Sequence, residues 1–146
     1  MANAVYDLGR QSFLSDSPAI DMDTDTIKAA LIDDTYVPNL ATDQYVDPAL
    51  GAAGAKIIAS AALASRTVLA GVFDAADVTF AAVATGKTVK YVAIYKDTGV
   101  LTTSPLIALI DTAAVNGGAS GAMSLLTNGG DITITWDNGA NKIFKV

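Results

Sequence analysis

Apolar residues alternate with other residues along several short segments of this 146-residue chain, and this period of two restricts its fold more than any other feature. In the segment "TVKYVAIYKDTG" at 88–99, one expected face carries Val89, Tyr91, Ala93 and Tyr95. The opposite face carries Val92 and Ile94. Because successive side chains of a strand point to opposite faces, the pattern predicts a strand that ends in a turn at 97–99.

The acidic residues favour the same structural class. All 15 of them are aspartate, and none is glutamate. Aspartate prefers turns and caps, whereas glutamate is well tolerated inside helices. Together with many β-branched and aromatic residues, this choice predicts a mainly β protein with Asp- and Gly-rich turns.

Further segments extend the predicted strands. Both faces of "DTIKAALID" at 25–33 are largely apolar, which predicts a central strand. Additional strands are expected at 77–83 and 105–111, and two within 55–72, although the alanines there also suit a helix. A closing hairpin is expected over 131–146, with Ile132, Ile134 and Trp136 on one face and a turn around Asn138-Gly139.

The remaining segments predict a short helix within 4–14 and two long loops, at 33–54 and 112–130. No fixed-period repeat and no linker divides the chain. We therefore expect one domain over 1–146, an antiparallel β-sandwich or flattened barrel of about eight strands.

Composition excludes several kinds of chemistry. The chain has no cysteine and no histidine, which removes thiolate chemistry, the common Ser-His pair and imidazole metal ligands. A net charge of −6 argues against a nucleic-acid partner, since phosphate contacts require clustered Lys and Arg. No secretory signal and no apolar run of roughly 20 residues is present, so we predict a soluble protein without a membrane partner.

Asp21, Asp23 and Asp25 stand at every second position before an apolar run, which raises the question of a calcium site. An EF-hand loop that starts at Asp21 would need glycine and glutamate where Thr26 and Ile32 stand. A looser site of the three carboxylates and a loop carbonyl stays open. The simpler interpretation, which we prefer, is that the aspartates form one solvent face that protects a strand end from edge pairing.

No spacing of Ser, Lys and Asp singles out a catalytic pair, and the glycine-rich "NGGASGA" at 116–122 lacks the Lys-Ser/Thr ending of a phosphate loop. The prediction is a protein that is not an enzyme and that carries no cofactor. Binding remains open. The contacts that we predict with a partner are Tyr36 and Tyr45 in the first long loop and Asn116, Gly117 and Gly118 in the second.

The chain as a whole resembles a family of small structural proteins of tailed-bacteriophage virions, of the kind that decorate heads. The likeness lies in the ordered blocks "MANAVYDLGRQSFL", "DTIKAALID", "FDAADVTF", "YVAIYKDTG", "SPLIALIDT" and "NGGDITITWDNGANKIFKV", of which the last is the most specific. The stretch at 116–130 departs from it by being richer in glycine and serine.

This resemblance implies a virion protein, with two possible structural roles. The first is a decoration or cement protein that binds the major capsid protein on the capsid exterior, as a trimer if it occupies three-fold positions. The second is a tail, baseplate or fibre-attachment component. A role of another class is a module that binds host-surface glycans through Tyr36, Tyr45 and Tyr91.

Overall fold

The computed structural model describes residues 3–146, which fold into antiparallel sheets with short helices between them. The strands are β1 (Ala4–Val5), β2 (Ile27–Asp33), β3 (Ile57–Ala62), β4 (Thr67–Leu69), β5 (Val72–Asp74), β6 (Val78–Phe80), β7 (Thr88–Lys96), β8 (Leu106–Ile110), β9 (Thr112–Val115), β10 (Gly121–Ala122), β11 (Leu125–Leu126), β12 (Ile132–Thr135) and β13 (Phe144–Lys145). The helices are α1 (Asp7–Ser12), α2 (Val46–Ala49) and the 3₁₀ turns η1 (Ala52–Gly54) and η2 (Leu101–Thr103). The predicted mainly β, sandwich-like class is therefore confirmed.

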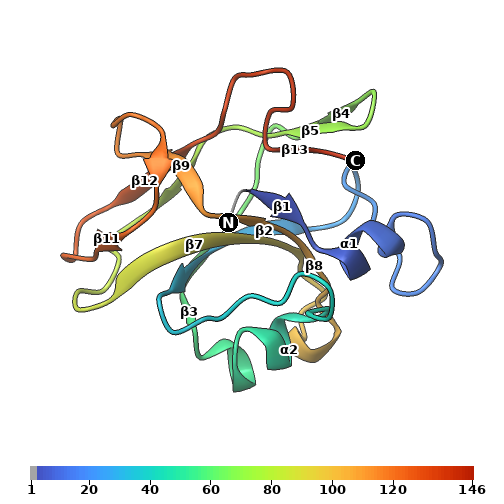
Figure 1. Cartoon of the computed structure of the whole chain (residues 1–146), viewed down its shortest axis with the longest axis horizontal. Coiled ribbons are helices and arrows are strands. Elements are labelled where there is room, and N and C mark those ends of the chain that lie inside the picture. Colours follow the sequence, from blue (N-terminus) through green and yellow to red (C-terminus); the bar gives the residue numbers. More distant parts are fainter. Residues whose placement is uncertain (1–2) are drawn as a thin grey trace.

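Three sheets form the body of the molecule (Figure 1). The central sheet has the order β1-β8-β7-β2-β3, with β11 paired to one end of β7. A second sheet has the order β10-β9-β12-β6, and a third has the order β13-β5-β4. Strands β8 and β9 follow each other across Asp111 alone, so one nearly continuous segment passes from the central sheet into the second sheet.

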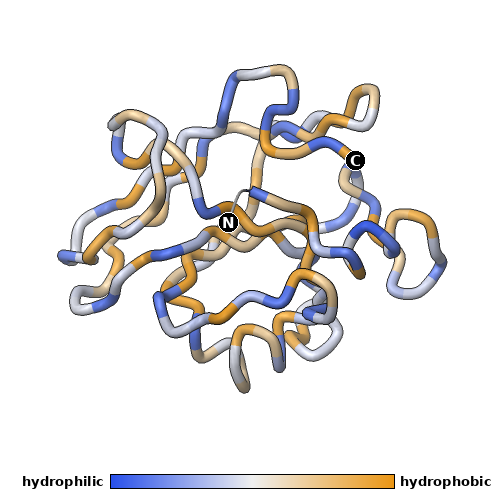
Figure 2. The backbone as a smooth tube through the Cα atoms, viewed as in Figure 1, coloured by the Kyte–Doolittle hydropathy of each residue, from blue (hydrophilic) through white to orange (hydrophobic). Residues whose placement is uncertain are grey.

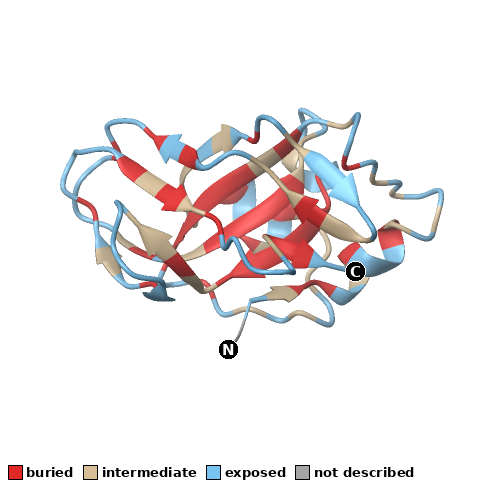
Figure 3. Cartoon of the chain, turned by 90° about the horizontal axis from the view of Figure 1, so that it is seen from above, coloured by how far each residue is buried: buried red, intermediate tan, exposed pale blue. Residues whose placement is uncertain are grey.

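The central sheet is buried on both faces. On one face, Ile27, Ala29 and Leu31 of β2 join the main core, which includes Phe73, Phe80, Ile134 and Phe144 from the two smaller sheets and Trp136 directly after β12. On the other face, Ala30 and Ile32 join a second core with Tyr6, Tyr36, Val46, Leu50 and Tyr95. Strands β2, β7 and β8 are mostly red in Figure 3, whereas the edge strand β3 is half-buried or exposed. The central position predicted for this strand is confirmed, since β2 lies between β7 and β3.

The segment between β2 and β3 covers the second core from below in Figure 1. It was expected to be a long loop, and it contains only the single turn α2 and the 3₁₀ turn η1. Hydrophilic stretches lie at the periphery, for example in α1 and in the loop that follows β12 (Figure 2). Within residues 3–146, no helix is both long and apolar enough to cross a membrane.

The predicted face of β7 that starts with Val89 is wrong at Val89 itself. Val89 joins the main core with Val92 and Ile94, whereas Tyr95 joins the second core. The register against β2 shifts between Ile32 and Asp33, so Asp33 pairs with Val89. This bulge places one extra residue in β7, which exchanges the faces on its two sides.

The predicted C-terminal hairpin is also wrong. Strand β12 pairs with β6 and β9, while β13 pairs with β5. Eight residues separate the two strands, so the Asn138-Gly139 pair does not close a two-residue turn. The chain crosses instead to the third sheet, where the rings of Phe144 and Phe73 lie 5.3 Å apart.

One other prediction needs correction. The stretch 112–130 is not one long loop, because β9, β10 and β11 lie within it and pair with neighbouring strands. The short helix expected within 4–14 is confirmed as α1, and strand β1, which pairs with β8, precedes it. The two strands predicted within 55–72 are present as β3 and β4, followed by the start of β5.

Candidate functional site

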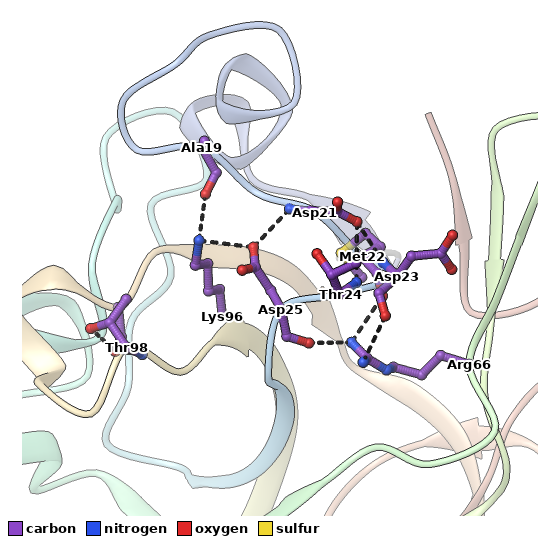
Figure 4. Close-up of polar contacts among 10 residues, drawn as sticks. Ala19, Asp21, Met22, Asp23, Thr24, Asp25, Arg66, Lys96 and Thr98 are labelled. Carbon is purple, nitrogen blue, oxygen red and sulfur yellow. Dashed lines mark hydrogen bonds and ion pairs between the residues drawn. The ribbon is translucent and has the colours of Figure 1, made fainter.

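The three alternating aspartates lie in a turn before β2 and not on the face of a strand (Figure 4). The Asp21 Oδ1 atom accepts hydrogen bonds from the backbone N–H groups of Asp23 (2.9 Å) and Thr24 (3.2 Å). The first of these bonds is the main reason that the pKa of Asp21 lies below its ordinary value. The Asp25 Oδ2 atom accepts the backbone N–H of Asp21 at 2.8 Å.

Two positively charged side chains from other parts of the chain stabilise this turn. Lys96, at the end of β7, places its Nζ atom 2.8 Å from Asp25 Oδ2 and donates to the Ala19 carbonyl oxygen at 2.8 Å. Arg66, from the connection between β3 and β4, donates to the carbonyl oxygens of Met22, Asp23 and Asp25. Figure 4 shows the guanidinium group pointing toward these oxygens.

This arrangement does not fit the candidate calcium site. The carbonyl oxygens that a calcium ion would need already accept hydrogen bonds from Arg66. In the part of the chain that the structure describes, no three His, Cys, Asp or Glu side chains are grouped so as to hold a metal ion. The preferred interpretation, a strand end protected by three aspartates, is also wrong in detail, because the carboxylates of Asp21 and Asp25 accept backbone N–H groups of a turn.

Tyr36 does not offer its ring to a partner, contrary to the prediction. Only 2% of the residue is exposed, and its ring meets that of Tyr91 edge-on at 5.8 Å. Its hydroxyl donates to Asp43 Oδ2 at 2.6 Å and lies 2.8 Å from the Tyr6 hydroxyl. Burial is the main cause that raises the pKa of both Tyr6 and Tyr36 above the ordinary value of 10.0. This network fastens the segment between β2 and β3 over the second core.

Tyr45 lies nearer the surface. It is half-buried and forms an isolated bridge with Pro105. Together with Asp43, Pro48 and neighbouring residues it lines a shallow pocket of about 430 Å³. All ten aromatic residues are buried or half-buried, so no ring within residues 3–146 is exposed as a flat stacking platform.

Asn116, Gly117 and Gly118 form the exposed turn after β9. Asn116 and Gly117 both have positive φ angles, of 51° and 77°. The backbone N–H of Thr133 donates to Asn116 Oδ1 at 2.8 Å, and the backbone N–H of Asn116 donates to the Thr133 carbonyl oxygen at 2.9 Å. The turn is therefore anchored to β12 while its tip stays accessible.

Sequence reasoning missed an apolar surface on the hairpin of β4 and β5. The exposed fractions are 78% for Leu69, 47% for Val68 and 54% for Val146. The backbone N–H of Val146 donates to the Gly71 carbonyl oxygen at 3.0 Å, so the C-terminal residue lies beside the hairpin turn. We call these three residues the hairpin patch. The signal in the sequence was two short β-branched runs around Ala70-Gly71.

The hairpin patch adjoins an open groove and a free strand edge. Leu69, Val72 and Ala140 help to line the groove, which has a volume of about 460 Å³. An ion pair at its rim joins Lys142 Nζ to Asp74 Oδ2 at 3.7 Å. Strand β4 is the last strand of the third sheet, and within residues 3–146 no strand pairs with its outer edge.

Comparisons with protein-family models, with curated proteins and with solved structures found no significant match.

Proposed function

We propose that this chain is a structural protein of a phage virion, and that it decorates the outside of the capsid by binding the major capsid protein. The resemblance along the whole sequence suggests the virion. The observation that carries a binding role is the hairpin patch, where exposed aliphatic side chains adjoin an unpaired strand edge. Proteins normally protect such edges with charges or cover them, because they pair readily with other chains.

The two parts of this surface would contribute differently to binding. Burial of Leu69 and Val146 removes apolar area from water and supplies affinity. The backbone groups at the outer edge of β4 set the direction in which an extended segment of the partner can pair. Many weak contacts of this kind, repeated over a shell, would stabilise the boundaries between capsid subunits.

The rigidity of the domain suits this role. A sheet buried on both faces holds β7 and β8 in place, and the covering segment is fastened by the network of Tyr6, Tyr36 and Asp43. The exposed turn at Asn116–Gly118 and the half-buried Tyr45 are further contacts with the capsid or between copies in a trimer. The glycan-binding alternative is weaker, because it depended on Tyr36 as an exposed ring.

The first experiment is to count copies of this chain relative to the major capsid protein in purified particles. A ratio near one or a simple fraction supports decoration. If the particle holds only as many copies as would form a few rings, the chain is a tail component instead. If the chain is absent from the particle, the proposal is wrong.

A matched pair of variants then tests the surface. Leu69→Asp places a charge in the hairpin patch, whereas Leu126→Asp changes a leucine that is 69% exposed on β11. We expect Leu69→Asp to reduce incorporation into particles by roughly tenfold or more, as for a central contact residue, and Leu126→Asp to leave it near the wild-type level. Equal incorporation of both variants would exclude the hairpin patch as the capsid contact.

A further inference from the structure

Three Asn-Gly pairs lie in exposed turns of this chain: Asn116-Gly117, Asn128-Gly129 and Asn138-Gly139. In such a pair the backbone nitrogen of glycine can attack the side-chain amide carbon of asparagine, since glycine has no side chain to obstruct the approach. The product is a cyclic succinimide, which water opens to aspartate or isoaspartate. The reaction needs an asparagine side chain that is free to turn toward its own backbone.

Two of the three asparagines are held in other positions. Asn116 Oδ1 accepts a hydrogen bond from the backbone N–H of Thr133 at 2.8 Å, and the backbone N–H of Asn116 donates to the Thr133 carbonyl oxygen. Asn128 Oδ1 accepts the backbone N–H of Gly130 at 3.0 Å, and the Gly130 carbonyl oxygen accepts a bond from Val83. In both cases an existing hydrogen bond must break before the side chain can react.

Asn138 differs from both. Its side chain is exposed and makes no hydrogen bond within residues 3–146. The attacking nitrogen beside it is already oriented, because the backbone N–H of Gly139 donates to Asp137 Oδ1 at 3.1 Å. The proton in this hydrogen bond is the one that the Gly139 nitrogen must lose, and it already points toward the Asp137 carboxylate.

We propose that Asn138 is a site of spontaneous deamidation, with Asp137 as the proton acceptor. The Gly139 nitrogen forms a bond to Asn138 Cγ while its proton passes to Asp137. The bond from Cγ to the amide nitrogen then breaks, and ammonia leaves with the proton that Asp137 returns. One water molecule opens the succinimide, which leaves a carboxylate where an amide stood.

The new charge would change the groove beside the hairpin patch. Asn138, Gly139 and Lys142 all line this groove, and Lys142 is paired there with Asp74. Deamidation adds a second carboxylate near the same ammonium group and takes the net charge of the chain from −6 to one unit lower. The modified and unmodified proteins would therefore differ at a surface that is open to partners.

The test is to incubate the purified full-length chain at neutral pH and to follow the three Asn-Gly peptides by mass spectrometry over time. We expect the Asn138 peptide to convert about tenfold faster than the other two, the ratio that corresponds to one net hydrogen bond. In urea the three rates should converge, because the dipeptides are identical once the fold is lost. Equal rates in the folded protein, or a faster rate at Asn116 or Asn128, would overturn the proposal.

Asp137→Ser tests the proton acceptor. Serine keeps an oxygen that can accept the Gly139 N–H, but it is not a base. We expect Asn138 to convert several-fold more slowly in this variant, with the Asn116 and Asn128 rates unchanged as internal controls. Unchanged conversion at Asn138 would overturn the role of Asp137, and changed rates at all three positions would show that the variant acts by loosening the fold.

Discussion

At the scale of single residues, Gly9 lies where the backbone of α1 closely approaches β8 of the central sheet. A Cβ atom built there would lie 2.6 Å from the Leu106 carbonyl oxygen and 3.0 Å from that of Ile107. Helix propensity alone favours alanine over glycine by about 1 kcal/mol. Here the contact with backbone atoms outweighs that preference, because neither the helix nor β8 can move freely.

We predict that Gly9→Ala lowers the free energy of unfolding by about 1 to 3 kcal/mol, measured by urea denaturation. Gly121→Ala is the control, since nothing lies within 4 Å of a Cβ atom at that position. Its effect should stay within about 0.5 kcal/mol. An unchanged midpoint for Gly9→Ala would mean that α1 does not rest on β8 as described.

Buried tyrosines make the protein sensitive to alkaline conditions. Burial is the main cause that raises the pKa of Tyr6, Tyr36 and Tyr95 above the ordinary value of 10.0. Below pH 10 the native and unfolded states both retain these phenolic protons. Above it the unfolded chain releases them and the native state does not, so the stability is lost as pH rises.

We therefore expect the free energy of unfolding to fall steadily above pH 10, and the phenolate absorbance of the native protein to lag behind that of the urea-unfolded chain. Tyr6→Phe should show a shallower fall, because one raised group is removed. Coincident titration curves for native and unfolded protein would contradict the buried network.

At the scale of elements, Arg66 joins the turn before β2 to the connection between β3 and β4. Its guanidinium group donates to three carbonyl oxygens of one turn, and a planar fork suits this task better than an ammonium group does. The turn thus depends on a residue about 40 positions away in sequence.

We predict that Arg66→Ala destabilises the protein by about 1 to 3 kcal/mol, because carbonyl oxygens lose charged donors. Arg66→Lys should restore only part of the loss. Lys90→Ala, at an exposed position of β7, is the control and should change thermal unfolding little. If Arg66→Lys were as stable as the wild type, the charge alone and not the fork would hold the turn.

The strands themselves were largely predictable from sequence, whereas their partners were not. Alternation located β2, β7, β8 and β12 because it depends only on local side-chain direction. The partner of β13 depends on Phe73 and Phe144 meeting across 71 positions, and no local pattern encodes that contact. The Asn138-Gly139 pair was misleading because the same dipeptide also suits a wide turn.

The predictions for the candidate site residues were wrong for a related reason. Tyr36 was expected at the surface because its neighbours in sequence are polar or turn-forming residues, but Asp43 satisfies its hydroxyl and permits burial. Asp21, Asp23 and Asp25 alternate as in a strand, yet carboxylates also accept backbone N–H groups in turns. The hairpin patch escaped notice because exposure is set by which strand lies at a sheet edge.

At the scale of the whole molecule, the central sheet combines strands that lie far apart in the sequence. Its order β1-β8-β7-β2-β3 places β2 beside a strand that starts more than 50 residues later. A fragment of residues 1–87 retains β2 and β3 but lacks β7 and β8. We predict that this fragment shows no cooperative unfolding and is digested rapidly by protease, while the full chain resists. A folded fragment would mean that the second core is stable without half of its sheet.

The strand order also determines when folding can start during synthesis. Strand β2, apolar on both faces, leaves the ribosome long before β7 exists to pair with one of its edges. At ordinary translation rates this interval lasts on the order of ten seconds. During that time the nascent chain exposes an apolar segment that can associate with other chains. A cell that makes many copies at once would therefore depend on chaperones to keep neighbouring nascent chains apart.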